Sequence, residues 1–397
     1  MKQDKICAAP WLHLHTFPNG NVYPCCLTPM EYPIGNLNQQ TLEEVWNSES
    51  LCKIRKQMIA GEEPESCTRC FNDEAHNKFS YRNHLNARFP KYQDLIKVTN
   101  ADGTLDQMDL QYWDFRFSNI CNMKCRTCGP QLSSGWYDDH KKLWGGLPAD
   151  VPDKIKQFDL WEQIIPFFDT VEEIYFAGGE PLIMEEHYRI LRKLEEMGRY
   201  DVRLRYNTNF SQMKYKKLDA LETWTKFEDV QVGASFDGYG KQAEYIRKGA
   251  SWEDIYNNRM KQKEVAPNVD FFVNFTLSIL NSFHIIDFHH YAVKTGLLDE
   301  YNNLHINYVY SPEYLSLQAL PPSLKEKVKN EYQKHADFLR KNNQDRSADQ
   351  FESSISFMES ENKHILNSKF KDNMLKLDNL RNESFVDVFP ELKELVE

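Results

Sequence analysis

The chain has 397 residues, of which 41% are hydrophobic and 13% aromatic, so it is long enough for two or three packed units with sizeable cores. Charged residues make up 27% of the chain, a share that excludes a membrane protein and a wholly disordered chain. The formal net charge of −11 argues against a broad nucleic-acid-binding surface, because such surfaces are basic.

The first segment, to about residue 90, predicts short elements. The sequence Pro-Asn-Gly-Asn at 18–21 is a turn signal between apolar runs and predicts a hairpin. Thr41 and Glu44 fit a capping box that opens a short helix, and a second helix is expected from Ser48 to Ala60. Residues 91–106 read as a polar connector.

Strands and helices alternate from about residue 108 to 310. The expected strands are 110–118, 171–177, 202–209, 228–236, 269–279 and 304–310, and the expected helices are 156–168, 182–198, 214–225, 239–262 and 283–295. Such β-α units in series predict an α/β fold with a parallel sheet, as a partial (β/α)6 TIM-like barrel or an open doubly wound sheet. The expected organisation is an amino-terminal Cys-rich α+β module at 1–90, a connector at 91–106, the barrel at 107–315 and a helical carboxy-terminal extension at 316–397.

All nine cysteines lie between Cys7 and Cys128. Thiols gathered in one third of a long chain are typical of metal ligands, whereas structural disulfides are usually spread through the fold. Residues 1–8 show neither the apolar run nor the cleavage site of a targeting signal. We therefore expect a chain of the reducing cytoplasm, without a membrane segment.

The central motif is Cys121-x3-Cys125-x2-Cys128, directly after the first strand of the α/β region. Three thiolates on one loop can hold three irons of a cubane cluster and leave the fourth iron open to a substrate or cosubstrate. Chemistry at the carboxyl end of a strand is typical of α/β barrels. A zinc knuckle lacking its fourth ligand, or three unrelated thiols, are the alternatives on spacing alone.

This loop and the strand order after it resemble the radical S-adenosylmethionine (SAM) enzymes over roughly residues 108–310. The resemblance implies a [4Fe–4S] cluster on the catalytic residues Cys121, Cys125 and Cys128. It also implies reductive cleavage of SAM to a 5′-deoxyadenosyl radical that abstracts hydrogen from the substrate. Thr127 departs from the family pattern, which often has an aromatic residue before the third cysteine.

The same resemblance implies a set of SAM-binding residues at the ends of later strands. The segment Gly178-Gly179-Glu180 would approach the SAM amino group, with Glu180 as its acceptor. Ser235 and Arg247 would hold the SAM carboxylate, since an arginine fork suits a carboxylate, and Asp237 lies in the same motif. Weaker assignments, to the ribose and the adenine, fall on Asn207, Thr208, Asn209, Val309 and Tyr310.

Polar residues alternate along the expected barrel strands. Because side chains on a strand point to alternate faces, the face of Asn207 also holds Arg203 and Arg205. We predict a polar lumen that binds substrate, with Arg116, Arg203 or Arg205 contacting an anionic group. The alternative is internal pairing of these arginines with Asp114.

The amino-terminal module carries a second set of thiols, Cys7, Cys25, Cys67 and Cys70. Four thiolates complete the coordination of a cluster, and a four-cysteine zinc site fits the spacing equally well. The Pro-Trp, Gly-x4-Cys, Ile-Gly-Asn-Leu and Cys-x2-Cys signals resemble the SPASM module in its one-cluster "twitch" form. Here the module precedes the barrel, whereas the common arrangement places it after the barrel.

The resemblance implies an oxidoreductase or a peptide- or metabolite-modifying enzyme. Its second [4Fe–4S] cluster would accept an electron or serve as an anchor. The expected partners are a peptide or small polar substrate and an electron donor such as flavodoxin or ferredoxin. An enzyme that modifies tRNA or another nucleic acid, and a metal-binding module on a catalytically inactive barrel, are the alternatives.

Overall fold

The computed structural model describes residues 5–75, 79–151 and 160–397. The chain divides into two compact units. The first comprises residues up to 119, 150–205 and 227–229, and the second comprises residues 120–149, 206–226 and 230–397. One of the points at which the chain passes from the first unit into the second lies inside strand β6 (Arg203–Thr208). The predicted boundaries near residues 90, 106 and 315 stay predictions.

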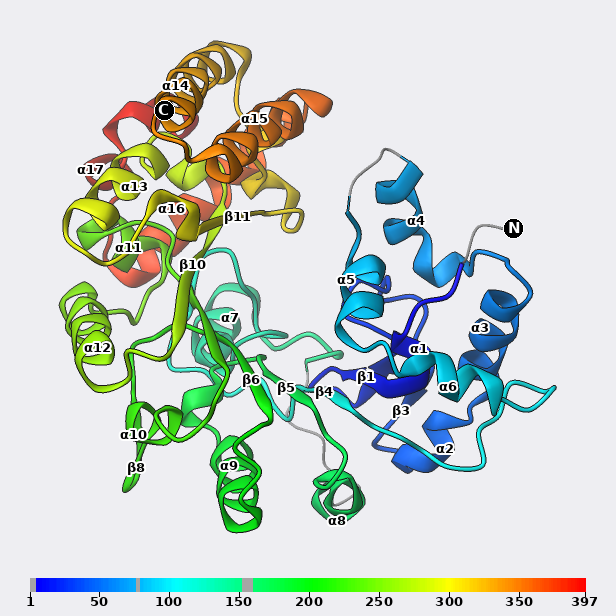
Figure 1. Cartoon of the computed structure of the whole chain (residues 1–397). Coiled ribbons are helices and arrows are strands. Elements are labelled where there is room, and N and C mark those ends of the chain that lie inside the picture. Colours follow the sequence, from blue (N-terminus) through cyan, green and yellow to red (C-terminus); the bar gives the residue numbers. More distant parts are fainter. Residues whose placement is uncertain (1–4, 76–78, 152–159) are drawn as a thin grey trace. The chain divides into compact units, whose positions relative to one another are not determined.

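The first unit combines short helices with a mixed sheet (Figure 1). Its strands lie in the order β5-β4-β1-β2-β3; the pairs β4–β5 and β1–β4 are parallel, and β1–β2 and β2–β3 are antiparallel. Its elements are α1 (Ala9–Leu12), β1 (His13–Thr16), β2 (Asn21–Tyr23), β3 (Gly35–Asn36), α2 (Leu42–Trp46), α3 (Glu49–Ile59), η1 (Glu65–Cys67), α4 (Thr68–Ala75), α5 (Tyr81–Arg88), α6 (Tyr92–Lys97), β4 (Tyr112–Phe115), α8 (Leu160–Ile164), η3 (Ile165–Phe167), β5 (Glu173–Phe176), η4 (Pro181–Ile183) and α9 (Glu185–Met197).

The local signals of the amino-terminal segment are confirmed. The turn at 18–21 joins β1 to β2, and Thr41 forms a reciprocal capping box with Glu44 at the start of α2. Ser48 caps α3 by accepting a hydrogen bond from the backbone N–H of Leu51. The strands of this segment are part of the same sheet as β4, because β1 pairs with β4 along its whole length.

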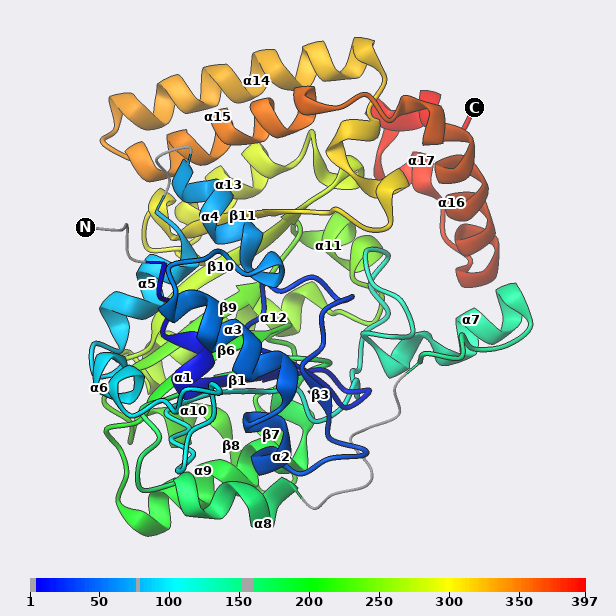
Figure 2. The same cartoon turned by 90° about the vertical axis from the view of Figure 1, so that its right-hand side faces the viewer.

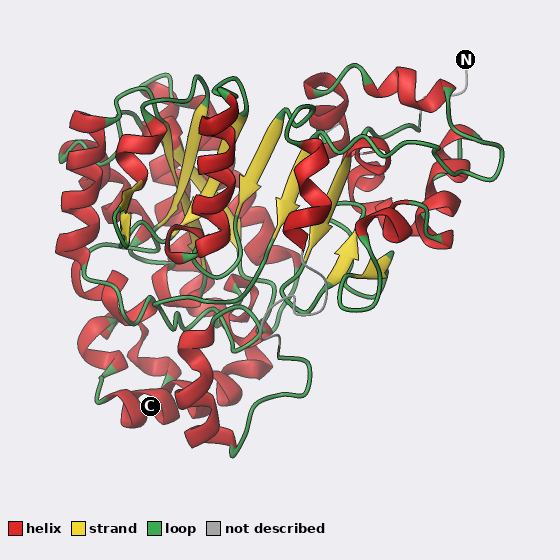
Figure 3. Ribbon diagram, turned by 90° about the horizontal axis from the view of Figure 1, so that it is seen from below, coloured by secondary structure: helices red, strands yellow, loops and turns green. Residues whose placement is uncertain are grey.

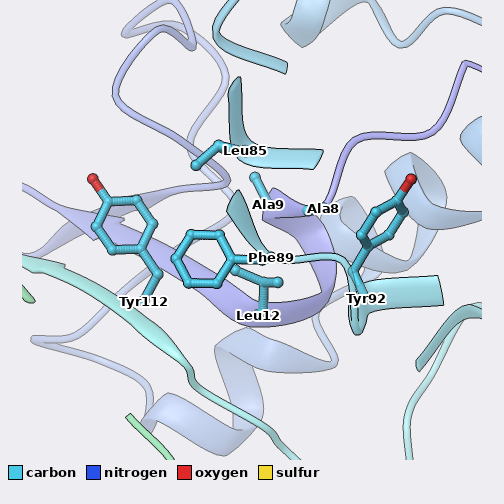
Figure 4. Close-up of a cluster of buried hydrophobic side chains, with 7 residues drawn as sticks. All are labelled: Ala8, Ala9, Leu12, Leu85, Phe89, Tyr92 and Tyr112. Carbon is cyan, nitrogen blue, oxygen red and sulfur yellow. The ribbon is translucent and has the colours of Figure 1, made fainter. Parts of the chain in front are cut away.

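The segment 91–106, expected to be a polar connector, contains helix α6 (Tyr92–Lys97). Figure 4 shows the packing of this helix: Tyr92 of α6 joins a buried cluster with Leu85 of α5, Phe89 just after α5, and Tyr112 of β4. The ring of Phe89 stacks on that of Tyr112 with a centroid distance of 5.7 Å. This cluster attaches helices α5 and α6 to the sheet.

The second unit carries three parallel strands in the order β9-β10-β11 and most of the helices in the described part of the chain. Its elements are η2 (Ser134–Trp136), α7 (Tyr137–Trp144), β7 (Lys214–Tyr215), β8 (Leu218–Asp219), α10 (Ala220–Trp224), β9 (Val230–Ser235), α11 (Gly240–Ile246), α12 (Trp252–Val265), β10 (Asp270–Leu277), η5 (Ile279–Asn281), α13 (Ile285–Lys294), η6 (Tyr301–Asn303), β11 (Leu304–Tyr308), η7 (Glu313–Leu315), η8 (Leu317–Ala319), α14 (Pro322–Lys341), α15 (Asp345–Ser360), η9 (His364–Leu366), α16 (Asn367–Arg381), α17 (Phe385–Val388) and η10 (Pro390–Leu395).

The six strands expected of the partial (β/α)6 TIM-like barrel all form, as β4, β5, β6, β9, β10 and β11. They alternate with helices along the chain, so the predicted α/β class is confirmed. On β10 the apolar residues Phe271, Val273, Phe275 and Leu277 are buried while Asn274 and Thr276 are partly exposed, which confirms the predicted alternation of faces.

Two expected helices differ from prediction. The segment 214–225 opens with the hairpin β7–β8, whose turn holds Lys216 at φ 54°, and only Ala220–Trp224 is helical. The segment 239–262 divides into α11 and α12, because Gly249 has φ 103° and Ser251 caps the second helix. Of the helix expected at 156–168, residues 156–159 lie outside the described residues.

The carboxy-terminal region is helical, as predicted (Figure 3). Helices α14 and α15 run side by side (Figure 2). Their buried contacts include Tyr332 of α14 and Phe351 of α15, whose ring centroids are 5.2 Å apart. In the described ranges, no helix combines the length and the apolar character that crossing a bilayer requires.

Replacing Phe89 by alanine should lower the free energy of unfolding by about 3–5 kcal/mol, because it opens a cavity beside Tyr112 and Leu85. Urea denaturation followed by circular dichroism measures the change. Phe79→Ala is the matched control, since Phe79 is 75% exposed and its loss should cost less than about 0.5 kcal/mol. Equal costs for the two substitutions would contradict the packing described for Phe89.

Candidate functional site

The three central thiols lie on one loop of the second unit. Cys125 is 5% exposed, and Cys121 and Cys128 are partly exposed. A hydrogen bond from Cys128 and the positive charge of Arg247 together lower the pKa of Cys125 to about 7, although burial opposes the shift. Nη1 of Arg247 lies 3.9 Å from the Cys125 sulfur. The loop therefore has the electropositive surroundings that favour thiolate ligands.

Backbone and amide contacts hold this loop in shape. The N–H of Met123 points to the sulfur of Cys121 at 3.5 Å. The side-chain amide of Asn209 donates to Asn122 at 2.8 Å and lies 4.0 Å from the Cys121 sulfur. Asn122 in turn donates to Ser211 at 2.9 Å. Asn209, expected near a ribose, thus contacts the cluster loop itself.

The segment after α11 lies directly against the cluster loop. The N–H groups of Lys124 and Arg126 donate to the carbonyls of Lys248 and Ile246, at 2.8 and 2.7 Å. A methyl group on Gly249 would lie 2.8 Å from the carbonyl oxygen of Asn122. The break between α11 and α12 therefore allows the backbone around Arg247 to pack against the cysteine loop.

Arg247 is fixed by a buried carboxylate. Its Nε lies 2.8 Å from Oδ2 of Asp237, which is fully buried. Burial opposes the charge of Arg247, but Asp237 outweighs it and keeps the pKa of the guanidinium above its ordinary value. Oδ1 of Asp237 accepts the N–H of Thr276 at 2.9 Å, and its carbonyl accepts from Asn281 at 3.1 Å. Asp237 thus orients Arg247 from the end of β9.

The remaining predicted residues of the second unit lie at strand ends. Ser235 is opposite Asn274 in the β9–β10 register, and the amide of Asn274 donates to Asn207. The hydroxyl of Thr208 accepts the N–H of Phe210, so it supports a turn. Val309 is 4% exposed, whereas Tyr310 is 59% exposed.

In the first unit, the Gly178-Gly179-Glu180 segment follows β5. Gly178 has φ 86°, and a methyl group there would lie 2.8 Å from Cβ of Arg116, so only glycine fits this position without displacing its neighbour. Oε1 of Glu180 accepts the N–H of Leu182 at 3.0 Å, and the residue is 1% exposed. The carboxylate expected to meet an ammonium group is therefore buried and held at the start of η4.

A buried His–Asp pair lies where β1 and β4 run side by side. Nδ1 of His15 is 2.5 Å from Oδ2 of Asp114, and both side chains are at most 2% exposed. Burial raises the pKa of Asp114, but His15 and Arg116 outweigh burial and lower it to about 2. Arg116 is 3.5 Å from the other oxygen of Asp114, and its guanidinium lies 5.3 Å from the ring centre of Phe17.

Arg203 and Arg205, predicted from sequence as possible substrate ligands, pair with carboxylates of the first unit. Arg203 donates to Glu173 at 2.9 Å. Arg205 donates through both of its Nη atoms to Asp229, at 2.6 and 2.7 Å. Arg203 and Arg205 thus pair with Glu173 and Asp229. The sequence suggests Asp114 as the alternative internal partner. Arg116 is the one of the three that pairs with Asp114.

The four amino-terminal thiols line a single cavity of the first unit. Cys7, Cys25, Cys67 and Cys70 are gathered there with Tyr81 and Arg82 among the lining residues. Burial, and then the mutual repulsion of the thiolates, raise the pKa of Cys7 and bring that of Cys67 to about 12. Such thiols become ligands when a metal displaces their protons, so the donor set has the chemistry of an iron–sulfur cluster site.

All nine cysteines lie in the described part of the chain, and none forms a disulfide. Within the same residues, no three or more His, Cys, Asp or Glu side chains converge on a position for a single metal ion. The donor chemistry of both thiol sets fits iron–sulfur ligation: three thiolates beside an arginine in one loop, and four in one cavity.

Comparison with known proteins bears on the amino-terminal segment. Residues 7–71 match the family model of SPASM, the iron-sulfur cluster-binding domain. This match spans all four cavity-lining cysteines and confirms the predicted resemblance to a SPASM module. No curated protein matches the chain.

Several solved structures match part of the chain. One is native anSMEcpe with bound AdoMet: 19% identity over 57% of this chain and 60% of that chain, TM-score 0.40. Another is SuiB of Streptococcus suis bound to precursor peptide SuiA: 16% identity over 76% of this chain and 62% of that chain, TM-score 0.39. The chain thus spans about three fifths of the length of these two structures.

The chain is therefore an α/β protein whose residues 7–71 match the SPASM iron-sulfur cluster-binding domain, and it carries a three-cysteine loop after strand β4. Sequence reasoning missed Asn122 and Gly249 beside the loop, and His15 beside Asp114. Asn122 lies inside the cysteine motif, so its position was a usable signal. Strand pairing places His15 beside Asp114, and the break between α11 and α12 places Gly249 beside Asn122. No local sequence pattern predicts either contact.

Gly249→Ala should destabilise the second unit more than Gly240→Ala. Both glycines have positive φ, 103° and 53°, but a methyl group meets the Asn122 carbonyl at the first and nothing within 4 Å at the second. We expect Gly240→Ala to cost about 1–2 kcal/mol, the conformational penalty alone, and Gly249→Ala to cost clearly more. Urea denaturation measures both, and an equal cost would contradict the close approach at Asn122.

Proposed function

We propose that the chain is a radical SAM enzyme that abstracts hydrogen from a peptide or a small polar substrate. The observation that carries the proposal is the arrangement around Cys125. Three thiols on one loop lie beside Arg247, and a buried carboxylate, Asp237, fixes that arginine. Three ligands leave one iron of a cubane open, which is the condition for direct coordination of a cosubstrate.

When bound, the [4Fe–4S] cluster would supply the one-electron reductive chemistry that divides SAM into methionine and the hydrogen-abstracting 5′-deoxyadenosyl group. The chain's own residues bind and orient. Cys121, Cys125 and Cys128 would hold the cluster, and the Arg247 guanidinium, kept charged by Asp237, would bind the SAM carboxylate. Contact of Gly178, Gly179 and Glu180 with the SAM amino group stays a prediction from the sequence.

The SPASM domain would hold an auxiliary [4Fe–4S] cluster on Cys7, Cys25, Cys67 and Cys70. Four protein thiolates leave no open iron, so this centre would exchange electrons with the substrate radical or anchor the domain. The external reductant is expected to be a flavodoxin or a ferredoxin. Since thiolates must stay reduced to bind iron, we place the enzyme in the reducing cytoplasm.

The substrate would be recognised through an anionic group at Arg116. This guanidinium lies over Phe17 and beside the His15–Asp114 pair, and its side chain is 21% exposed. Arg203 and Arg205 are engaged by Glu173 and Asp229 and would support the sheet.

Anaerobic reconstitution should load about eight irons per chain, four for each cubane. The triple variant Cys121→Ala/Cys125→Ala/Cys128→Ala should retain about four irons and form no 5′-deoxyadenosine from SAM under reduction. The quadruple alanine variant of Cys7, Cys25, Cys67 and Cys70 should lose the other four. Iron analysis, electron paramagnetic resonance (EPR) and product chromatography measure these outcomes.

Cys52→Ala is the control for that experiment, because Cys52 lies on α3 and belongs to neither thiol set. It should keep the full iron content and full SAM cleavage. Cleavage of SAM by the triple variant would refute the proposed function. Zinc in place of iron in the amino-terminal set would refute the auxiliary cluster alone.

With any substrate that is turned over, Arg116→Ala should raise KM by about tenfold or more, as expected for the loss of one charged hydrogen bond. Substrate-independent cleavage of SAM should be unchanged. Arg205→Ala is the control, since both of its Nη atoms are bound by Asp229; it should leave KM within about twofold. An unchanged KM in Arg116→Ala would assign that arginine a structural role.

A further inference from the structure

We propose that helix α16 of the carboxy-terminal extension holds the cysteine loop in its cluster-binding shape through Arg126, Asp378 and Arg381, which act as positioning residues. The inference rests on the proposed function, because it assumes that Cys121, Cys125 and Cys128 bind the SAM cluster. It assigns a role to the end of a chain whose sequence beyond residue 316 carries no motif of the barrel.

The first anchor is Arg126, which follows Cys125 directly. This arginine is 2% exposed, and its Nη2 donates to Asp378 at 2.6 Å and to Glu383 at 2.7 Å. Its guanidinium carbon lies 3.7 Å from the ring centre of Tyr245. The Tyr245 hydroxyl donates to the same Asp378 oxygen at 2.6 Å. A buried carboxylate at the end of α16 thus joins the cysteine loop to helix α11.

The second anchor is Arg381, one helical turn after Asp378. Its Nε donates to Asp139 at 2.8 Å and its Nη2 donates to the carbonyl of Lys124 at 3.0 Å. Lys124 reaches the other oxygen of Asp139 at 2.7 Å. The Lys124 carbonyl belongs to the residue before Cys125, so one anchor holds the backbone before that ligand and the other holds the side chain of the residue after it.

A third contact closes the arrangement around Cys125. The guanidinium of Arg381 lies 4.7 Å from the ring centre of Trp136, and the indole N–H of Trp136 donates to the Cys125 carbonyl at 2.9 Å. Contacts that involve α16 therefore hold Cys125 and the residues on either side of it. Lys124 is held through its carbonyl, Cys125 through Trp136, and Arg126 through its guanidinium.

The buried charges of Arg126, Asp378 and Arg381 are not needed to attach helix α16 to the rest of the unit. Helix α16 already buries Phe370, Met374 and Leu377, and apolar contacts of that kind would attach a helix without desolvating any charge. Burying Arg126, Asp378 and Arg381 is costly unless each is paired with good geometry. The ion pairs give the loop a defined position. Through Tyr245 and the Ile246 carbonyl, they also fix the position of Arg247.

The test compares carboxylates on one helix in the full-length protein. Asp378→Asn removes the buried charge, while Asp372→Asn removes an exposed one that pairs with Lys376 on the same helix. Each variant is reconstituted anaerobically and measured for iron content, for the change of the EPR signal on adding SAM, and for the rate at which a chelator removes iron. Circular dichroism and melting temperature report the fold.

We expect Asp378→Asn and Arg381→Met to keep the auxiliary cluster and the secondary structure. The other cluster should lose iron to the chelator about tenfold faster or more, as expected when a buried charged hydrogen bond is lost. Its EPR response to SAM should be weakened. Asp372→Asn should match the wild type. Arg126→Lys should recover part of the iron retention lost in Arg126→Met, because lysine restores the charge beside Asp378.

Wild-type iron retention and a wild-type SAM response in Asp378→Asn and Arg381→Met, whatever their melting temperatures, would overturn the inference and leave the proposed function standing. Absence of a SAM-responsive cluster in the wild-type protein would overturn both. If Arg126→Met failed to fold, Arg126→Lys and Asp378→Asn would still decide between the two results.

Discussion

The side chain of Arg247 lies between a buried carboxylate and the sulfur of Cys125, and the organisation of the second unit follows from this placement. Thiolates in a buried loop need positive charge nearby, and a buried arginine needs a carboxylate. Asp237 at the end of β9 meets the second need. The break between α11 and α12, with Gly249 against the loop, meets the first by bringing the arginine to the sulfur. Sheet, helix break and loop thus satisfy one electrostatic constraint together.

A comparable coupling exists in the first unit between the SPASM segment and the sheet. The amino-terminal strand β1 pairs in parallel with β4, so the domain contributes a strand to the sheet as well as thiols to a cavity. The register places His15 opposite Asp114. The module that precedes the barrel in sequence therefore lies directly beside strand β4. Its residue His15 contacts Asp114, which in turn pairs with Arg116.

Much of this could be read from local patterns in the sequence, and the remainder could not, for a definite reason. Alternation along β10 and the capping box at Thr41 involve neighbours within a few residues, and both appear in the structure as expected. The spacing of the cysteines is equally local. By contrast, Arg205 finds Asp229 on the segment before β9, and the split at Gly249 depends on the backbone of Asn122. Such partners are chosen by the tertiary fold, which overrides local propensity.

The longest of these connections explains why the carboxy-terminal extension belongs to the site. Arg126 and Asp378 are 252 positions apart, yet the entropy of closing a loop grows only slowly with its length, so distance in sequence is a weak objection to such an anchor. Geometry is the stronger constraint. The Arg126 guanidinium contacts Asp378, Glu383 and the Tyr245 ring. Without α16 and the Glu383 that follows it, the guanidinium would lose both carboxylates and remain a buried charge with only the ring and backbone beside it. A shape of the cysteine loop that buries Arg126 is therefore favourable only once the last helices have folded. The ligand geometry of the loop therefore depends on the carboxy-terminal helices as well as on the loop's own residues.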